Sequence, residues 1–330
     1  KRVFLNSDSV LLFGFGVFYT LTSIYTLSEN YYLEKIGYLW LAIFSFRLPF
    51  LLFSEKKDLD KFFAVLKTFT FIAAILLFYL LVSNQWWLFI TKHEVLNVPN
   101  YLAVGGFMAG IFIYNLINLN KFNTLLSIVI FIFMLLLSGR GPVIGIALVS
   151  LMYFVVKKMR ILTILKGVTF LLIVSLIISS KIGDNVELIN SYNRFISIAG
   201  GNSARNVQLH DAIEIIKGSP LLGVGIGGYG MAEAGLDERW HPHKTILEIV
   251  AESGLIISAL FVIFIFKVFI DGWLLRKDSE EKFIYLLLAL FYMLQSLKSG
   301  GIADVRVTFF WLGLLSASKK LIQKDIRYEG

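Results

Sequence analysis

The sequence contains no cysteine among its 330 residues. This absence excludes a disulfide framework, thiolate zinc sites, iron–sulfur ligation and a cysteine nucleophile. Any chemistry must therefore come from oxygen, imidazole, guanidinium or amine groups.

Charge is also scarce, because Asp, Glu, Lys and Arg together make up only 16% of the chain, against about 25% in soluble domains. Hydrophobic residues make up 57%. This composition predicts an integral membrane protein. The net charge of +8 then reflects membrane orientation and does not indicate a nucleic-acid partner.

Apolar runs long enough to cross a hydrocarbon core of ~30 Å predict an all-α polytopic protein with about ten transmembrane helices. The polar residues that follow Lys1 and Arg2 predict that the first run is not a cleaved signal peptide. The predicted spans are 9–27, 36–53, 62–83, 100–118, 123–139, 142–156, 161–180, 245–270, 283–297 and 303–318.

Basic residues cluster in alternate connections between these spans. The positive-inside rule assigns those connections and both termini to the cytoplasm. The clusters are Lys1/Arg2, Lys56/Lys57/Lys61, Lys121, Lys157/Lys158/Arg160, Arg276/Lys277/Lys282 and Lys319/Lys320/Lys324/Arg327.

One large connection, residues 181–244 between spans seven and eight, is predicted to be extracytoplasmic. Residues 204–217 in it have helical periodicity, with Asn202 or Ser203 as N-cap and Gly218-Ser219-Pro220 as the end. Functional residues are concentrated in such loops. We treat 1–330 as a single membrane domain, with 181–244 carrying part of the active site.

The glycine-rich run 223–230 must turn sharply. Although 225–230 formally reads G-x-G-x-x-G, a helix precedes it, and a dinucleotide fingerprint needs a preceding strand. Two interpretations remain: the glycines allow close backbone packing, or their N–H groups line an anion site.

His241-Pro242-His243 precedes span eight. A metal site is one interpretation, but converging ligands and a supporting second shell are not visible. Pro242 suits the first turn of a helix, which would set His243 beside the positive end of the helix dipole. That position favours a neutral imidazole, which can accept a proton.

Charged residues near the membrane give further candidates. Arg140, flanked by glycines at a helix start, suits an oxyanion or phosphate site, or snorkels to water as an interfacial arginine. Glu248 is four residues from Lys244, which predicts a helix-surface ion pair. Glu252 is expected to orient a neighbour or stay protonated, and Arg47 to be paired or to line a polar cavity.

Several of these motifs occur in an order that resembles one family. Ser138-Gly139-Arg140-Gly141 at a helix end is followed by Asn193-Arg194-Phe195 and Ser203-Ala204-Arg205 in the loop. Pro220-Leu-Leu-Gly-x-Gly and His243-x3-Leu-x4-Glu-x-Gly254 come next. The chain resembles the O-antigen polymerase (Wzy) and O-antigen ligase superfamily of bacterial polysaccharide assembly, in motif over about 130–260 and in topology throughout.

The resemblance implies a metal-independent, inverting glycosyltransferase without cofactor. It would face the periplasm or cell exterior from the bacterial inner membrane, with undecaprenyl-diphosphate-linked oligosaccharides as donor and acceptor. A chain-length regulator protein is a further expected partner. By motif, His243 is the catalytic base, and Arg140, Arg194 and Arg205 bind substrate. We add His241 to the substrate-binding residues.

Three functions are compatible with these features. A polymerase of repeat units is favoured, because Lys244 and Ile257 depart from the usual ligase pattern. A ligase that transfers glycan to lipid A core or protein shares the donor site. A transporter or flippase with an anion-binding vestibule ranks below both, because it would show repeated topology and polar breaks near mid-membrane.

Overall fold

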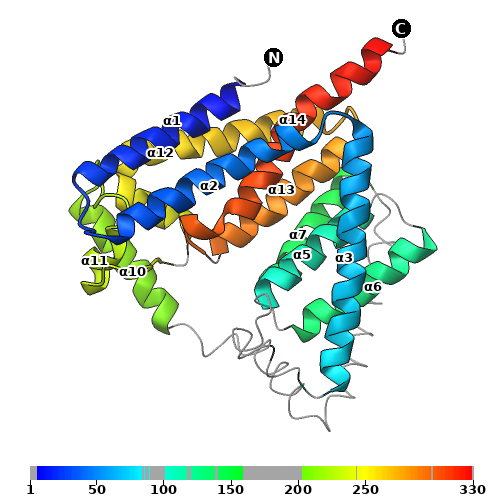
Figure 1. Cartoon of the computed structure of the whole chain (residues 1–330), viewed down its shortest axis with the longest axis horizontal. Helices are drawn as coiled ribbons and strands as arrows, with labels where there is room; N and C mark the ends of the chain where they lie inside the picture. The colour runs from blue at the N-terminus through cyan, green and yellow to red at the C-terminus, as the bar shows by residue number, and fades with distance from the viewer. Residues whose placement is uncertain are drawn as a thin grey trace. The chain divides into compact units, whose positions relative to one another are not determined.

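The computed structural model describes residues 6–83, 85, 89, 101–116, 120–137, 140–158, 203–242, 244–298 and 300–328, and the regular structure within these ranges is helical (Figure 1). The helices in chain order are α1 (Ser7–Leu21), η1 (Thr22–Ile24), α2 (Tyr31–Leu52), α3 (Lys56–Val82), α5 (Tyr101–Asn115), α6 (Lys121–Leu136), α7 (Arg140–Val156), α10 (Ser203–Gly218), α11 (Tyr229–Ala234), α12 (Thr245–Leu275), α13 (Glu280–Lys298), η2 (Ile302–Asp304) and α14 (Arg306–Tyr328).

An all-helical fold is confirmed for the described residues, and a helix covers the main part of every predicted span except 161–180, which lies outside them. Among the described residues, four helical stretches are long and apolar enough to cross a membrane: Ser7–Ile24, Tyr31–Leu52, Lys56–Val82 and Thr245–Leu275. Shorter apolar helices occupy the fourth, fifth and sixth predicted spans. The count of ten spans and their orientation stay predictions.

The chain forms two compact units, residues 1–58 with 201–330, and residues 59–200. The first holds α1, α2 and everything from α10 to α14, so the two ends of the chain fold together. The second holds most of α3 with α5, α6 and α7. The sequence-based interpretation as one membrane domain stays a prediction.

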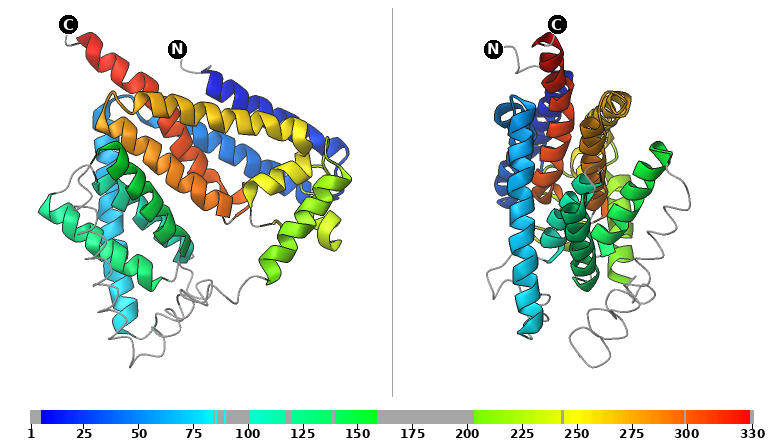
Figure 2. Two further views of the ribbon diagram at one scale, coloured as in Figure 1. Left: turned by 180° about the vertical axis from the view of Figure 1, so that it is seen from behind. Right: turned by 90° about the vertical axis from the view of Figure 1, so that its right-hand side faces the viewer.

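In the first unit, α1 packs along α12, α2 along α14, and α13 against both α12 and α14 (Figures 1 and 2). Phenylalanines form the centre of this bundle. The ring centroid of Phe261 on α12 lies 5.0 Å from that of Phe15 on α1 and 6.1 Å from that of Phe309 on α14. All three rings are buried. Aromatic pairs at these distances add to the free energy gained by burying their area, and they fix the site-bearing helix α12 against α1 and α14.

A cluster of four charges ties α1, α12 and α14 together towards the C-terminal end of α12. Lys267 and Asp271, four residues apart on α12, form an ion pair at 2.7 Å. The Lys319 ammonium lies 2.8 Å from the buried Asp8 carboxylate and 2.5 Å from Asp271. Two ammonium groups therefore balance two carboxylates.

Arg47 is paired, as expected. Its Nη1 donates to Ser9 Oγ at 2.5 Å, and its guanidinium lies 5.0 Å from the centre of the Phe50 ring.

In the second unit, α3 exposes large apolar side chains along much of its length, including Phe69, Ile75 and Phe78. A helix with this surface requires a hydrocarbon environment. Phe63 on the same helix is buried and stacks on Tyr114 of α5, with 3.7 Å between ring centroids.

Candidate functional site

The predicted loop helix is present as α10, Ser203–Gly218, and Gly218-Ser219-Pro220 ends it as expected. Its apolar face does not stand free in the loop. Ala212 is buried against Tyr229 and Ala251, with Ile216 and Leu247 packed around them. The C-terminal half of α10 is thereby fixed to the first turns of α12.

The glycine-rich run turns sharply, which confirms the sequence prediction. Gly223, Gly225 and Gly227 have φ values of +70°, +83° and +80°, which glycine adopts readily and other residues do not. A Cβ on Gly225 would lie 2.2 Å from the Cα of Thr26 in the α1–α2 connection. The glycines therefore allow both the turns and the close approach of two backbones.

The N–H groups of residues 223–229 all donate to acceptors within the protein. Three of these groups donate to Glu252. Gly225 N donates to its backbone carbonyl at 2.9 Å, and Gly227 N and Tyr229 N donate to its side-chain carboxylate at 3.0 and 3.3 Å. The other four bind Ser219 O, Ala251 O, Thr22 Oγ1 and Gly225 O. The run does form a nest of N–H groups around an anion, but that anion is the side chain of Glu252.

Helix α12 is broken where the glycine-rich run meets it. Gly254 has φ +68° and ψ 176° inside the helix, which interrupts the hydrogen-bond ladder. The freed groups find partners in the loop: the Ala251 carbonyl accepts from Val224 N at 3.0 Å, and Leu255 N donates to Pro220 O at 2.9 Å. The break is therefore satisfied by the loop and does not expose backbone.

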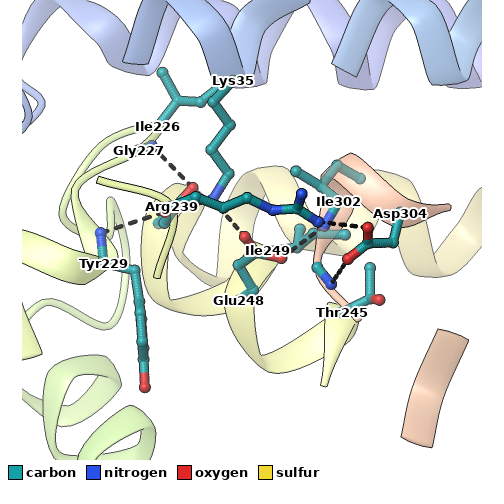
Figure 3. A network of polar contacts seen from close by, with 12 residues as sticks. Lys35, Ile226, Gly227, Tyr229, Arg239, Thr245, Glu248, Ile249, Ile302 and Asp304 are labelled. Carbon is teal, nitrogen blue, oxygen red and sulfur yellow. Dashed lines mark hydrogen bonds and ion pairs between the residues drawn. The ribbon is translucent and has the colours of Figure 1, made fainter. Parts of the chain in front are cut away.

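Two buried carboxylates, those of Glu248 and Glu252, lie on α12 just before this break, and a buried ammonium from α2 faces them (Figure 3). Lys35 reaches from α2, and its ammonium lies 2.5 Å from Glu248 Oε1 and 2.7 Å from Glu252 Oε1. All three side chains are at most 3% exposed. The predicted surface pair between Lys244 and Glu248 is wrong, because α12 begins at Thr245 and turns Glu248 inward to Lys35.

Neutral donors complete this Lys35–Glu248–Glu252 cluster. The Tyr19 hydroxyl donates to Glu252 Oε2 at 2.6 Å, and Ile302 N donates to Glu248 Oε2 at 2.7 Å. One ammonium faces two carboxylates, so these donors, with Gly227 N and Tyr229 N, supply the remaining stabilisation of the negative charge. The cluster joins α1, α2, the glycine-rich run, α12 and the 300–302 turn.

Sequence reasoning missed Lys35 because it assigned this residue to a connection between spans. The available signal was the pair Glu248 and Glu252, one helical turn apart in an apolar helix. Two such carboxylates must face the protein interior and need a cation. Lys35 also lies near the start of an apolar run, where a lysine requires a partner.

His241 is half-buried and belongs to the segment of chain that connects α11 to α12. Burial lowers the pKa of its imidazole, Asp304 opposes this shift, and the positive charges of Arg239 and Lys35 add to it. A His with a lowered pKa is neutral near pH 7. Arg239 Nη2 is held 2.5 Å from Asp304 Oδ1 beside it (Figure 3).

Pro242 does not open the helix, contrary to the sequence prediction, because Lys244 is the N-cap and the helix starts at Thr245. The catalytic candidate His243 lies outside the described residues.

The three candidate arginines come from separate parts of the chain. Arg140 is the first residue of α7, in the unit 59–200, and Arg205 is in the first turn of α10, in the other unit; the structure describes only their backbones. Arg194 lies outside the described residues. Their convergence stays a prediction. Within the described ranges, no group of three His, Asp or Glu residues is arranged to hold a metal ion.

The length and apolar composition of four helices in the described residues indicate a polytopic membrane protein, with part of its loop folded onto α12. Residues 125–262 match the family model described as O-antigen ligase. This match supports the resemblance to the O-antigen polymerase and ligase superfamily that the motifs predicted, and the matched range includes α10, the glycine-rich run and both buried glutamates. No curated protein matches the chain.

Proposed function

We propose that this protein is a membrane glycosyltransferase that joins oligosaccharide repeat units carried on undecaprenyl diphosphate into a surface polysaccharide. The observation that carries the proposal is the match of residues 125–262 to the O-antigen ligase family. Polymerases and ligases of this superfamily use the same class of donor and differ in the acceptor.

The reaction sets two chemical requirements. An acceptor hydroxyl attacks the anomeric carbon of the donor, and the bond from that carbon to the diphosphate breaks. The hydroxyl proton must pass to a base, and the departing lipid diphosphate must be stabilised. A single displacement of this kind inverts the anomeric configuration.

His243 is the proposed base, since a neutral imidazole accepts a proton near pH 7. The lowered pKa of its neighbour His241 supports a site in which imidazoles are uncharged. Arg140, Arg194 and Arg205 are proposed to bind the diphosphate, because a guanidinium pairs bidentately with phosphate oxygens and stays charged. The helix that carries Arg205, α10, and the helix that follows His243, α12, belong to the same compact unit.

A ligase that transfers finished glycan to lipid A core or protein is the second candidate, and the description of the matched family favours it. Loss of a polymerase leaves surfaces capped with single repeat units. Loss of a ligase leaves long lipid-linked chains that never reach their acceptor. Gel analysis of surface and lipid-linked glycan from a deletion strain therefore separates the two.

In that deletion strain, a copy carrying His243→Ala is expected to lower polymer formation by about 10²- to 10⁴-fold, the usual contribution of a general base. Arg205→Ala and Arg140→Ala are each expected to lower it by about 10²- to 10³-fold, by analogy with the loss of one transition-state donor. Glycan chain length on gels, at protein levels matched by immunoblot, measures the effect.

His210→Ala is the matched control, because this imidazole lies on α10 with 73% of its side chain exposed. It should leave chain length unchanged. Full-length polymer at normal amount from His243→Ala would show that His243 is not the base.

A further inference from the structure

An exposed apolar surface lies on the 181–244 loop, which the sequence predicts to be outside the membrane. Leu221 and Leu222, in the turn after α10, are 59% and 56% exposed. Ile24, at the end of η1, is 81% exposed. The Tyr25 hydroxyl donates to Leu222 O at 2.7 Å, and Leu27 N donates to Val224 O at 3.1 Å. The turn and the end of η1 therefore form one apolar surface.

This surface is continuous with helix faces that have the composition of membrane spans. On α1, large apolar side chains are exposed up to Ile24: Val10, Phe13, Phe18 and Leu21. On α12, exposed apolar side chains begin directly beside the turn, at Leu255 and Ile256, and continue through Ile263 and Phe266. The turn sits between two faces that must both contact hydrocarbon.

The length of α12 gives the depth of the turn. Leu255 N is hydrogen-bonded to Pro220 O, so the turn lies level with Leu255. Asp271, in the charged cluster with Asp8 and Lys319, follows Leu255 by sixteen positions, which is about 24 Å at ~1.5 Å per residue. The hydrocarbon core is ~30 Å thick, and any tilt shortens the distance along its normal.

Irregular backbone tolerates such depth only if its polar groups are satisfied by the protein. Most of the polar backbone groups here meet that condition: Gly223 N, Val224 N and Gly225 N donate to protein carbonyls, Leu222 O accepts from the Tyr25 hydroxyl, and Pro220 has no N–H. Among the described contacts, only the N–H groups of Leu221 and Leu222 in this stretch have no acceptor. Gly254 allows this contact, since a Cβ there would lie 2.1 Å from Leu221 O.

We propose that the Pro220–Leu222 turn, with Ile24, enters the acyl-chain region of the leaflet nearer the glycine-rich loop, as a re-entrant segment set into the break of α12. The turn anchors the glycine-rich run and the Lys35–Glu248–Glu252 cluster at the boundary between hydrocarbon and headgroups. Nothing in this inference depends on the proposed function.

The absence of cysteine makes the test direct, since each introduced cysteine is unique. The full-length protein with Leu222→Cys is labelled with a nitroxide and reconstituted into vesicles of phosphatidylethanolamine and phosphatidylglycerol. Collision rates with oxygen, which partitions into acyl chains, are compared with those of a water-soluble nickel chelate. Phe266→Cys, 64% exposed on the apolar face of α12, is the lipid reference, and His210→Cys on α10 is the water reference.

The ratio of oxygen to nickel collisions at position 222 is expected to fall on the Phe266 side of the midpoint between the two references. A ratio on the His210 side overturns the proposal. Ile24→Cys is a second reporter that leaves the turn itself intact, and it must give the same answer. Both reporters are surface positions, so labelling does not require the core to open.

Discussion

Replacing Lys35 by methionine is expected to destabilise the first unit by about 3–5 kcal/mol, the usual cost of removing one partner from a buried ion pair. The ammonium is the only cation within 4.0 Å of Glu248 and Glu252 among the described residues. Without it, two buried carboxylates one helical turn apart would repel each other. Thermal or denaturant unfolding of the purified protein in a mild detergent measures the change.

Two further variants make this result interpretable. Lys56→Ala removes the exposed pair with Glu281 and should cost only about 0–1 kcal/mol. Adding Glu248→Gln and Glu252→Gln to Lys35→Met should recover part of the lost stability, because a neutral site needs no counter-charge. If Lys35→Met and Lys56→Ala unfold alike, the buried cluster does not stabilise the fold.

Much of the helical architecture could be predicted from the sequence because its signals are local. Apolar runs gave the spans, and the periodicity of 204–217 with Gly218-Ser219-Pro220 behind it gave α10. The glycine-rich run likewise predicted sharp turns, and three of its glycines do have positive φ. Each of these features depends on residues within about twenty positions of one another.

The polar centre could not be predicted in the same way. Lys35 and Glu248 are 213 positions apart, and no local pattern links them. The local rule that pairs residues four apart on a helix selected Lys244 for Glu248, and it failed because Lys244 precedes the helix. The start of α12 was also misjudged from Pro242. The helix begins at Thr245, whose hydroxyl donates to the carbonyls of Ser296 and Gly300, both distant in sequence.

The glycine-rich run and the buried charges form one hydrogen-bonded network. The pattern 225–230 invites a phosphate-binding interpretation, yet the N–H groups of Gly227 and Tyr229 bind the carboxylate of Glu252. Glu252 in turn binds Lys35, and Lys35 binds Glu248. The N–H groups of residues 223–229 are therefore already bound within the protein, and the proposed phosphate ligands are the arginines.

Gly254→Ala is expected to destabilise the fold by about 2–6 kcal/mol. A Cβ at this position would lie 2.1 Å from Leu221 O and 2.3 Å from Leu221 C, both backbone atoms that cannot rotate away. The backbone at φ +68° and ψ 176° lies in a region that is nearly restricted to glycine and costs a residue with a side chain roughly 1–3 kcal/mol, and overpacking typically adds ~1–3 kcal/mol. Unfolding in detergent measures the loss.

Two glycines of the same chain separate these contributions. Gly235 has φ +67° but open space around it, so Gly235→Ala should show only the conformational cost of about 1–2 kcal/mol. Gly14 in α1 has ordinary helical φ and open space, so Gly14→Ala should be stabilising by about 0.5–1 kcal/mol. Equal losses from Gly254→Ala and Gly235→Ala would show that the turn does not pack into the break of α12. The re-entrant position of Leu222 would then lose its structural basis, because the close approach of Leu221 O to Gly254 is what allows Pro220 O to accept from Leu255 N.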